Sequence, residues 1–115
     1  MEYPKPDFKK QKKAQNNKRI LEPRRCALCH RVLLCETHEV FGGVNRQNSI
    51  EYGFQVPLDS RCHDLVTRNS ESTLEAQQNW RTCYQELQEE TWQSEGKTPE
   101  EARAMWIELM GRNYL

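Results

Sequence analysis

Hydrophobic positions in this chain follow two different periods, which divide it into a β-prone middle and a helical end. Val32–His38 is a short β-prone run and Tyr52–Leu58 alternates tyrosine, phenylalanine and valine, so both predict short strands. Pro57 indicates that the second strand is an edge strand or ends nearby, because proline donates no backbone hydrogen bond. Glycine, asparagine and serine residues predict a loop over 41–49. A helix is expected to begin at Cys62.

Residues 71–115 carry a helical pattern, in which apolar side chains recur every three or four positions. Residues 94–97 interrupt the pattern, so two helices are predicted. The second helix has Thr98 as its N-cap, Pro99 at its first position and Glu101 closing a capping box. Gly111 is expected to end it. The resulting order of strand, loop, strand, helix and two further helices predicts an α+β fold with a ββα unit.

Composition limits the size of the core and the kind of protein. The chain has 115 residues, of which 36% are hydrophobic, so a core of this size needs a staple such as a metal ion or a disulfide. No segment approaches the roughly 18 apolar residues of a membrane span, and the start has no apolar signal region. We therefore expect a cytoplasmic protein without membrane association. In that compartment, clustered cysteines favour metal binding over disulfides.

The formal net charge is zero, but the charges are unevenly distributed. Residues 1–25 hold nine Lys or Arg against three acidic residues, and residues 71–115 hold nine Glu against four basic residues. Residues 1–24 therefore predict a basic, extended N-terminal arm. One interpretation is that the arm binds a polyanion, most simply nucleic acid, and the other is that it only solubilises the chain. The candidate contacts in the arm are Lys9, Lys10, Lys12 and Lys13.

Four of the five cysteines lie between residues 26 and 62. Cys26 and Cys29 have the spacing of a zinc knuckle, and Cys62 is the natural third thiolate. Asp59 stands where a second Cys-x2-Cys motif would place its first cysteine, so a Cys3Asp site for Zn²⁺ is predicted. A redox function of the Cys-x2-Cys pair is disfavoured, because no βαβ pattern accompanies it. The other candidates for the fourth ligand are Cys35 and His30.

A longer series of motifs surrounds these cysteines. It runs from Cys26-x2-Cys29 through His38-Glu-Val-Phe-Gly-Gly-x-Asn-Arg46 and Tyr52-Gly-Phe-x-Val-x-Leu58 to Cys62-His63, and the chain ends in Met110-Gly-Arg-Asn-Tyr-Leu115. This series resembles the small phage-encoded HNH (His-Me finger) endonucleases over about residues 24–115. The resemblance implies a zinc-stapled ββα-metal core over 25–70, with 71–115 as a helical extension of the same domain.

The resemblance also implies a hydrolytic site for nucleic-acid phosphodiesters. It places one divalent ion, Mg²⁺ or Mn²⁺, between the end of the first strand and the start of the helix, where His63 matches a metal ligand. His38 and Glu39 match the strand-end pair, and two assignments stay open. Either His38 binds the ion and Glu39 is the base, or His38 is the base and Glu39 the metal carboxylate. Asn45 and Asn48 match the loop asparagine, with Asn45 the closer match.

Two functions follow from these motifs. The first is a metal-dependent endonuclease that acts on DNA as a nickase or double-strand cutter, in a bacterial host cell if the gene is phage-encoded. The second is a catalytically degenerate zinc module that binds DNA or a protein partner in phage recombination, packaging or counter-defence. With either function, a protein partner or a homodimer is a further expectation. The second is considered because Thr67 stands where the family commonly has a further histidine. Candidate phosphate contacts outside the arm are Arg46, Arg61 and Arg68.

Overall fold

The computed structural model describes residues 21–115. They fall into two compact units, of which the first ends at Leu74 and the second runs from Glu75 to Leu115. The arm lysines Lys9, Lys10, Lys12 and Lys13 lie outside the described residues. Within residues 21–115, no helix is long and apolar enough to cross a membrane.

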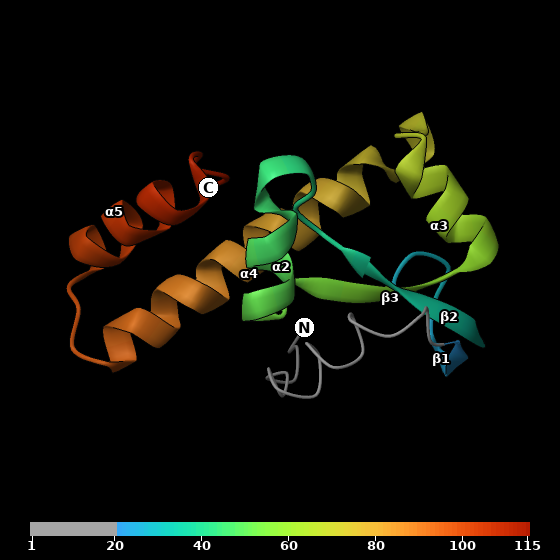
Figure 1. The fold of residues 1–115 in the computed structure, drawn as a ribbon, viewed down its shortest axis with the longest axis horizontal. Helices are drawn as coiled ribbons and strands as arrows, with labels where there is room; N and C mark the ends of the chain where they lie inside the picture. The colour runs from blue at the N-terminus through green and yellow to red at the C-terminus, as the bar shows by residue number, and fades with distance from the viewer. Residues whose placement is uncertain (1–20) are drawn as a thin grey trace. The chain divides into compact units, whose positions relative to one another are not determined.

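The first unit contains a three-stranded antiparallel sheet in the order β1-β2-β3 (Figure 1). The strands are β1 (Glu22–Arg25), β2 (Val32–Glu39) and β3 (Gln55–Asp59). The central strand is β2, so β3 is an edge strand, as Pro57 indicated. The expected end of the arm at residue 24 falls inside β1. Its sequence, EPRR, shows no strand pattern, and the segment is extended because it pairs with the start of β2.

The segment between β2 and β3 is more ordered than the sequence indicated. The loop expected over 41–49 is wrong in part, because the 3-10 helix η1 (Gly43–Asn45) and the helix α2 (Arg46–Tyr52) occupy most of it. The buried Ser49 hydroxyl helps to order this segment, since it accepts from the Phe41 N–H at 3.0 Å and donates to the Phe41 carbonyl at 2.7 Å. Both backbone groups of Phe41 are thereby satisfied inside the unit.

The second strand starts later than predicted, because Gly53 ends α2. Gly53 adopts a left-handed conformation with φ 76°, which is accessible to glycine at little cost, and β3 follows at Gln55. The helix α3 (Ser60–Thr67) then begins directly after β3, two residues before the predicted start. A short 3-10 helix, η2 (Glu71–Thr73), follows. The buried apolar residues of this unit include Val40, Phe41, Ile50, Phe54, Val56, Leu58 and Val66.

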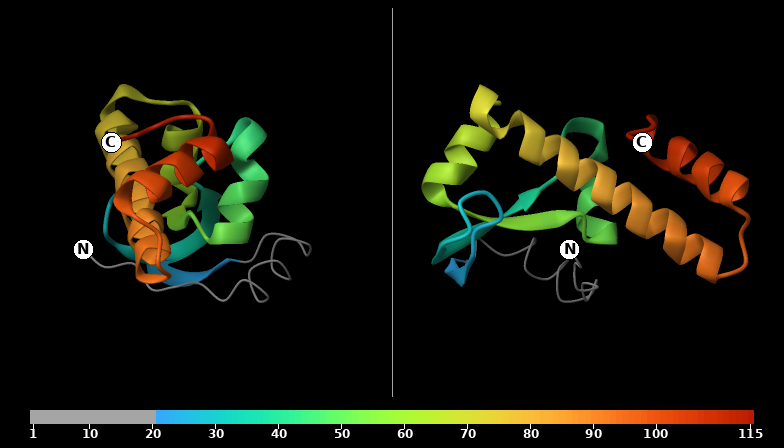
Figure 2. Two further views of the ribbon diagram at one scale, coloured as in Figure 1. Left: turned by 90° about the vertical axis from the view of Figure 1, so that its left-hand side faces the viewer. Right: turned by 180° about the vertical axis from the view of Figure 1, so that it is seen from behind.

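The second unit pairs α4 (Leu74–Ser94) with α5 (Pro99–Met110), which lie side by side and antiparallel (Figure 2). The predicted caps of α5 are confirmed. The Thr98 hydroxyl accepts from the Glu101 N–H at 3.1 Å, the Glu101 carboxylate accepts from the Thr98 N–H at 2.9 Å, and Gly111 is left-handed with φ 81°.

The C-terminal turn is held by one buried glutamine of α4. The Gln85 amide donates to Glu89 at 2.7 Å and to the Asn113 side chain at 2.8 Å, and its carbonyl accepts from the Tyr114 N–H at 2.7 Å. Glu89 also binds Arg103 of α5 at 2.8 Å. Because Gln85 is fully buried and its polar atoms are all bonded, it fixes the Arg-Asn-Tyr-Leu ending against α4.

Candidate metal centre and histidine cluster

Three thiols and one carboxylate meet in the first unit. The ligand atoms of Cys26, Cys29, Asp59 and Cys62 all lie within 4.8 Å of one another. Tetrahedral zinc with Zn–S bonds of about 2.3 Å needs sulfurs roughly 3.8 Å apart, so a small contraction suffices. The structure thus brings together the four residues predicted from their spacing. They could hold a metal ion, and their chemistry is compatible with zinc; we refer to them as the metal centre.

The turn between β1 and β2 presents the first two thiols. It is closed by backbone bonds from the Cys26 N–H to the Arg31 carbonyl and from the His30 N–H to the Cys26 carbonyl, both 2.9 Å long. The Ala27 N–H donates to the Pro57 carbonyl at 2.8 Å, which fastens the turn to β3. The other two ligands therefore come from the strand that this turn contacts and from the helix that follows it.

Asp59 is the most strongly engaged member of the metal centre. Its Oδ1 accepts from the Cys62 N–H at 2.9 Å, and its Oδ2 lies 3.1 Å from the Cys29 sulfur. The backbone bond from Cys62 holds the pKa of the Asp59 carboxyl well below its usual range. Asp59 is therefore ionised at neutral pH, as a metal ligand must be.

The thiols of the metal centre differ in their environments. A backbone hydrogen bond at Arg31 lowers the pKa of Cys29, and a side-chain hydrogen bond to Cys29, with the charge of that thiolate, raises the pKa of the Arg31 guanidinium. Burial raises the pKa of Cys62. A cation at the centre would lower thiol pKa values, because thiolates rather than thiols bind metals.

Two other candidates for the fourth ligand lie outside this group. Cys35 is fully buried in β2, its thiol donates to the Arg24 carbonyl at 3.3 Å, and burial raises its pKa. His30 is an exposed residue with a left-handed backbone, at φ 67°. Of the candidates, Asp59 is the one that the fold directs at the three thiols.

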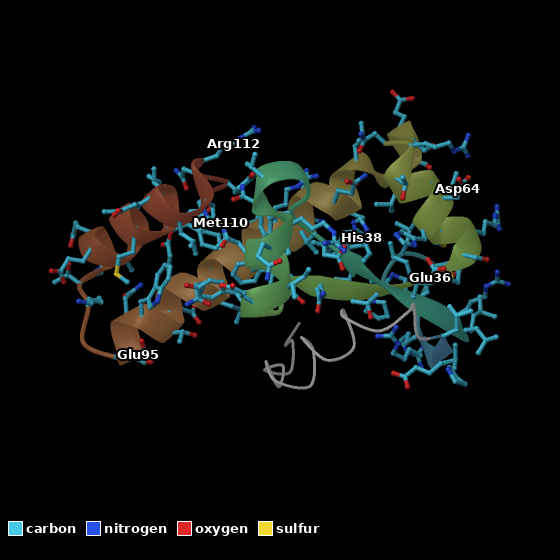
Figure 3. The ribbon with its side chains drawn as sticks, in the orientation of Figure 1. Glu36, His38, Asp64, Glu95, Met110 and Arg112 are labelled. Carbon is cyan, nitrogen blue, oxygen red and sulfur yellow. The ribbon has the colours of Figure 1, made fainter. Side chains whose placement is uncertain are left out.

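A second cluster of titratable side chains joins β2 to α3, and we call it the histidine cluster. It consists of Glu36 and His38 on β2 and His63 on α3; Glu36 and His38 lie along the same strand (Figure 3). The His63 Nδ1 lies 2.5 Å from Glu36 Oε1. The His38 and His63 rings meet edge to face, with centroids 5.2 Å apart and planes at 73°.

Glu36 was not among the residues predicted from the sequence. It lies two residues before His38, and the period of two in a strand puts both side chains on one face of the sheet. The period of two could have placed Glu36 beside His38 from the sequence. The contact of Glu36 with His63 depends on the packing of α3 and could not have been predicted in this way. Glu36 is only 8% exposed and has a histidine as its partner, which is unusual for a carboxylate.

Glu39 has other partners than His38. Its Oε1 lies 3.4 Å from Arg46 Nε, and its Oε2 accepts from the Gln55 amide at 3.3 Å. Adjacent residues of a strand point to opposite faces, so His38 and Glu39 are directed differently although they are neighbours in sequence. Asn45 and Asn48 lie close together, since the Asn48 amide donates to Asn45 Oδ1 at 3.1 Å.

The remaining predicted residues lie at the surface of the first unit. Thr67 is exposed at the last position of α3, one turn after His63. Arg68 pairs with Asp64 at 3.1 Å, and both side chains are more than half exposed, so the pair contributes little stability. Arg46 and Arg61 are also exposed. Three guanidinium groups are thus available to solvent, two of them with a carboxylate partner.

Replacing one thiol of the metal centre should show how much a bound metal contributes to thermal stability. We expect strong chelation to lower the thermal transition of the wild type, since a metal at 1,000 times its Kd stabilises a protein by about 4.1 kcal/mol. Cys62→Ser should unfold at a lower temperature and respond little to the chelator. The measurement is a thermal melt with and without chelator.

The matched control is Cys83→Ser, in the second unit and outside the metal centre. It should respond to the chelator like the wild type. A wild-type transition that strong chelation leaves unmoved would show that the metal centre does not stabilise the fold.

No protein-family model matches the chain, and no curated protein or solved structure matches it either. The likeness to HNH endonucleases therefore rests on the sequence motifs alone, and the function that it implies is a proposal.

Proposed function

We propose that this protein is a metal-dependent HNH-type endonuclease that hydrolyses DNA phosphodiester bonds, as a nickase or a double-strand cutter. The observation that carries the proposal is the histidine cluster, in which β2 and α3 bring His38, His63 and Glu36 together. A structural Zn²⁺ in the adjacent metal centre and a catalytic Mn²⁺ or Mg²⁺ at the cluster belong to the same proposal.

His38 is the group best suited to activate water. A neutral imidazole has an ordinary pKa near 6.5, so it accepts a proton readily at neutral pH. The carboxylate of Glu39 is already engaged by Arg46 and Gln55, which favours a positioning role over that of a base. Of the two assignments left open by the sequence, this supports His38 as the base.

His63 is the candidate ligand of the catalytic ion. Its Nδ1 faces Glu36, and if that nitrogen carries the proton, Nε2 keeps a lone pair for a metal. Glu36 then fixes the tautomer and the orientation of the ring. When bound, the ion would neutralise charge that develops on the phosphate and on the leaving oxygen. Imidazole nitrogen suits Mn²⁺ better than Mg²⁺, which prefers oxygen ligands.

The loop and the exposed basic residues complete the proposed DNA site. The bond between Asn48 and Asn45 joins η1 to the first turn of α2 and suits an asparagine pair that holds this segment in shape. Arg46 is 58% exposed in its side chain and begins α2, where it can reach a phosphate. Arg61, Arg68 and the arm lysines would add charge that does not depend on sequence.

A second candidate function is favoured by Thr67. It occupies the position one turn after His63 where the family commonly supplies a histidine, and a threonine methyl and hydroxyl are poor substitutes for imidazole. A domain that lacks this ligand could keep its zinc and its DNA or protein partner and lose hydrolysis. Dependence on a second metal distinguishes the two functions.

His38→Ala should abolish plasmid nicking and leave the protein folded, because His38 is only partly buried and a general base contributes about 10²- to 10⁴-fold to rate. Cleavage is followed with Mn²⁺, Mg²⁺ or EDTA. His30→Ala, an exposed histidine outside the cluster, is the control and should cut normally. If the wild type and Thr67→His both bind DNA and neither cuts it with either ion, the non-catalytic function is correct.

Glu36→Gln should weaken Mn²⁺ binding by about 10- to 100-fold, the usual effect of losing a carboxylate that orients a ligating histidine. Mn²⁺ titration followed by electron paramagnetic resonance measures this directly, without a cleavage assay. Glu51→Gln, an exposed carboxylate on α2, serves as the control. Equal Mn²⁺ affinity in Glu36→Gln and the wild type would exclude an orienting role for Glu36.

Deleting residues 1–18 should reduce the salt dependence of DNA binding. Each phosphate contact that is lost should lower the slope of log K against log salt by about 0.9 for duplex DNA, because fewer counterions are released. Fluorescence anisotropy over a salt series measures the slope, with Lys97→Gln in the second unit as the control. An unchanged slope would leave the arm with a solubilising role.

A further inference from the structure

The two carboxylate oxygens of Asp59 serve two different parts of the first unit. Oδ1 accepts from the Cys62 N–H at 2.9 Å and so caps the start of α3, while Oδ2 lies 3.1 Å from the Cys29 sulfur in the metal centre. We propose that Asp59 is a positioning residue that couples metal binding at the cysteines to the placement of His63. In this arrangement Oδ2 binds the ion and Oδ1 sets the first turn of α3.

Position 59 favours aspartate because no residue separates β3 from α3. β3 ends at Asp59 and α3 begins at Ser60, so no loop residue is present to serve as the N-cap. A cysteine at position 59 would supply a thiolate but no oxygen for the Cys62 N–H. Aspartate is among the best N-cap residues and is also an acceptable zinc ligand, so it satisfies both requirements.

The first turn of α3 transmits the effect to the histidine cluster. Cys62 is a member of the metal centre and donates to Asp59, and His63 is the next residue along the helix. The His63 ring meets Glu36 and His38 of β2. The turn is therefore held by the ion, by the cap and by Glu36. Without the ion, only the cap and Glu36 hold it, and His63 samples a wider range of positions.

Two substitutions separate the roles of Asp59. Asp59→Asn keeps an oxygen that can cap α3 but removes the charged ligand. Asp59→Cys keeps a charged ligand and removes the cap. Both are made in the full chain and labelled with ¹⁵N. Zinc affinity is measured by competition with a chelator, and the position of His63 by its amide and imidazole resonances together with amide exchange at Cys62 and His63.

The expected results are opposite for the two variants. Asp59→Asn loses zinc affinity, but at saturating zinc its His63 resonances match those of the wild type. Asp59→Cys binds zinc at least as tightly as the wild type, yet its His63 resonances shift and its Cys62 and His63 amides exchange about fivefold faster, as expected for a lost N-cap. Asp64→Asn, an exposed carboxylate on the same helix, changes neither readout.

Either of two results would overturn the proposal. Wild-type zinc affinity in Asp59→Asn would show that the carboxylate is not a ligand. Wild-type His63 resonances and exchange in zinc-loaded Asp59→Cys would show that the cap does not position His63. If Asp59→Cys does not fold, Asp59→Glu replaces it, because glutamate keeps a carboxylate that can bind zinc but is not among the favoured N-caps; its His63 resonances and exchange should shift as described for Asp59→Cys. Neither readout involves cleavage, so the result stands whether or not the protein cuts DNA.

Discussion

The first unit depends on the direct passage from β3 into α3 at Asp59 and Ser60. Because no residue separates strand from helix, the end of the sheet fixes the start of α3, and the same carboxylate faces the thiols of the β1–β2 turn. That turn is itself fastened to β3 through the Pro57 carbonyl. A flexible linker at this point would detach Cys62 and α3 from the turn and β3, which hold the other three ligands.

The side chains of the central strand β2 contact α3 and the segments on both sides of the strand. Glu36 and His38 face α3, whereas Cys35 pairs with Asp59 in the sheet and its thiol bonds to the backbone of β1. Glu39, at the end of the strand, anchors Arg46 of α2 and Gln55 of β3. One strand thus supplies the histidine cluster through one set of alternate residues and the packing of its neighbours through the other.

Local signals in the sequence predict the parts of the structure that local bonds stabilise. The caps of α5 and the Cys26-x2-Cys29 pair are read from residues close together in the sequence, and both appear in the structure. Strand β1 could not be predicted, because EPRR becomes extended only by pairing with β2. Glu36 could not be predicted as a partner of His63 either, since 27 residues separate them and only the packing of α3 on the sheet brings them together.

The net charge around the metal centre affects whether this part of the protein can attract a polyanion. Three thiolates and one carboxylate carry four formal negative charges, so a bound Zn²⁺ leaves a net charge of about −2. The Arg31 guanidinium beside Cys29 offsets part of it. Residues 21–74 nevertheless hold six arginines against seven acidic residues, and no lysine. Residues 21–74 therefore give a polyanion no net electrostatic attraction. In the proposed nuclease, the lysines of residues 1–20 would therefore supply much of the sequence-independent attraction for DNA.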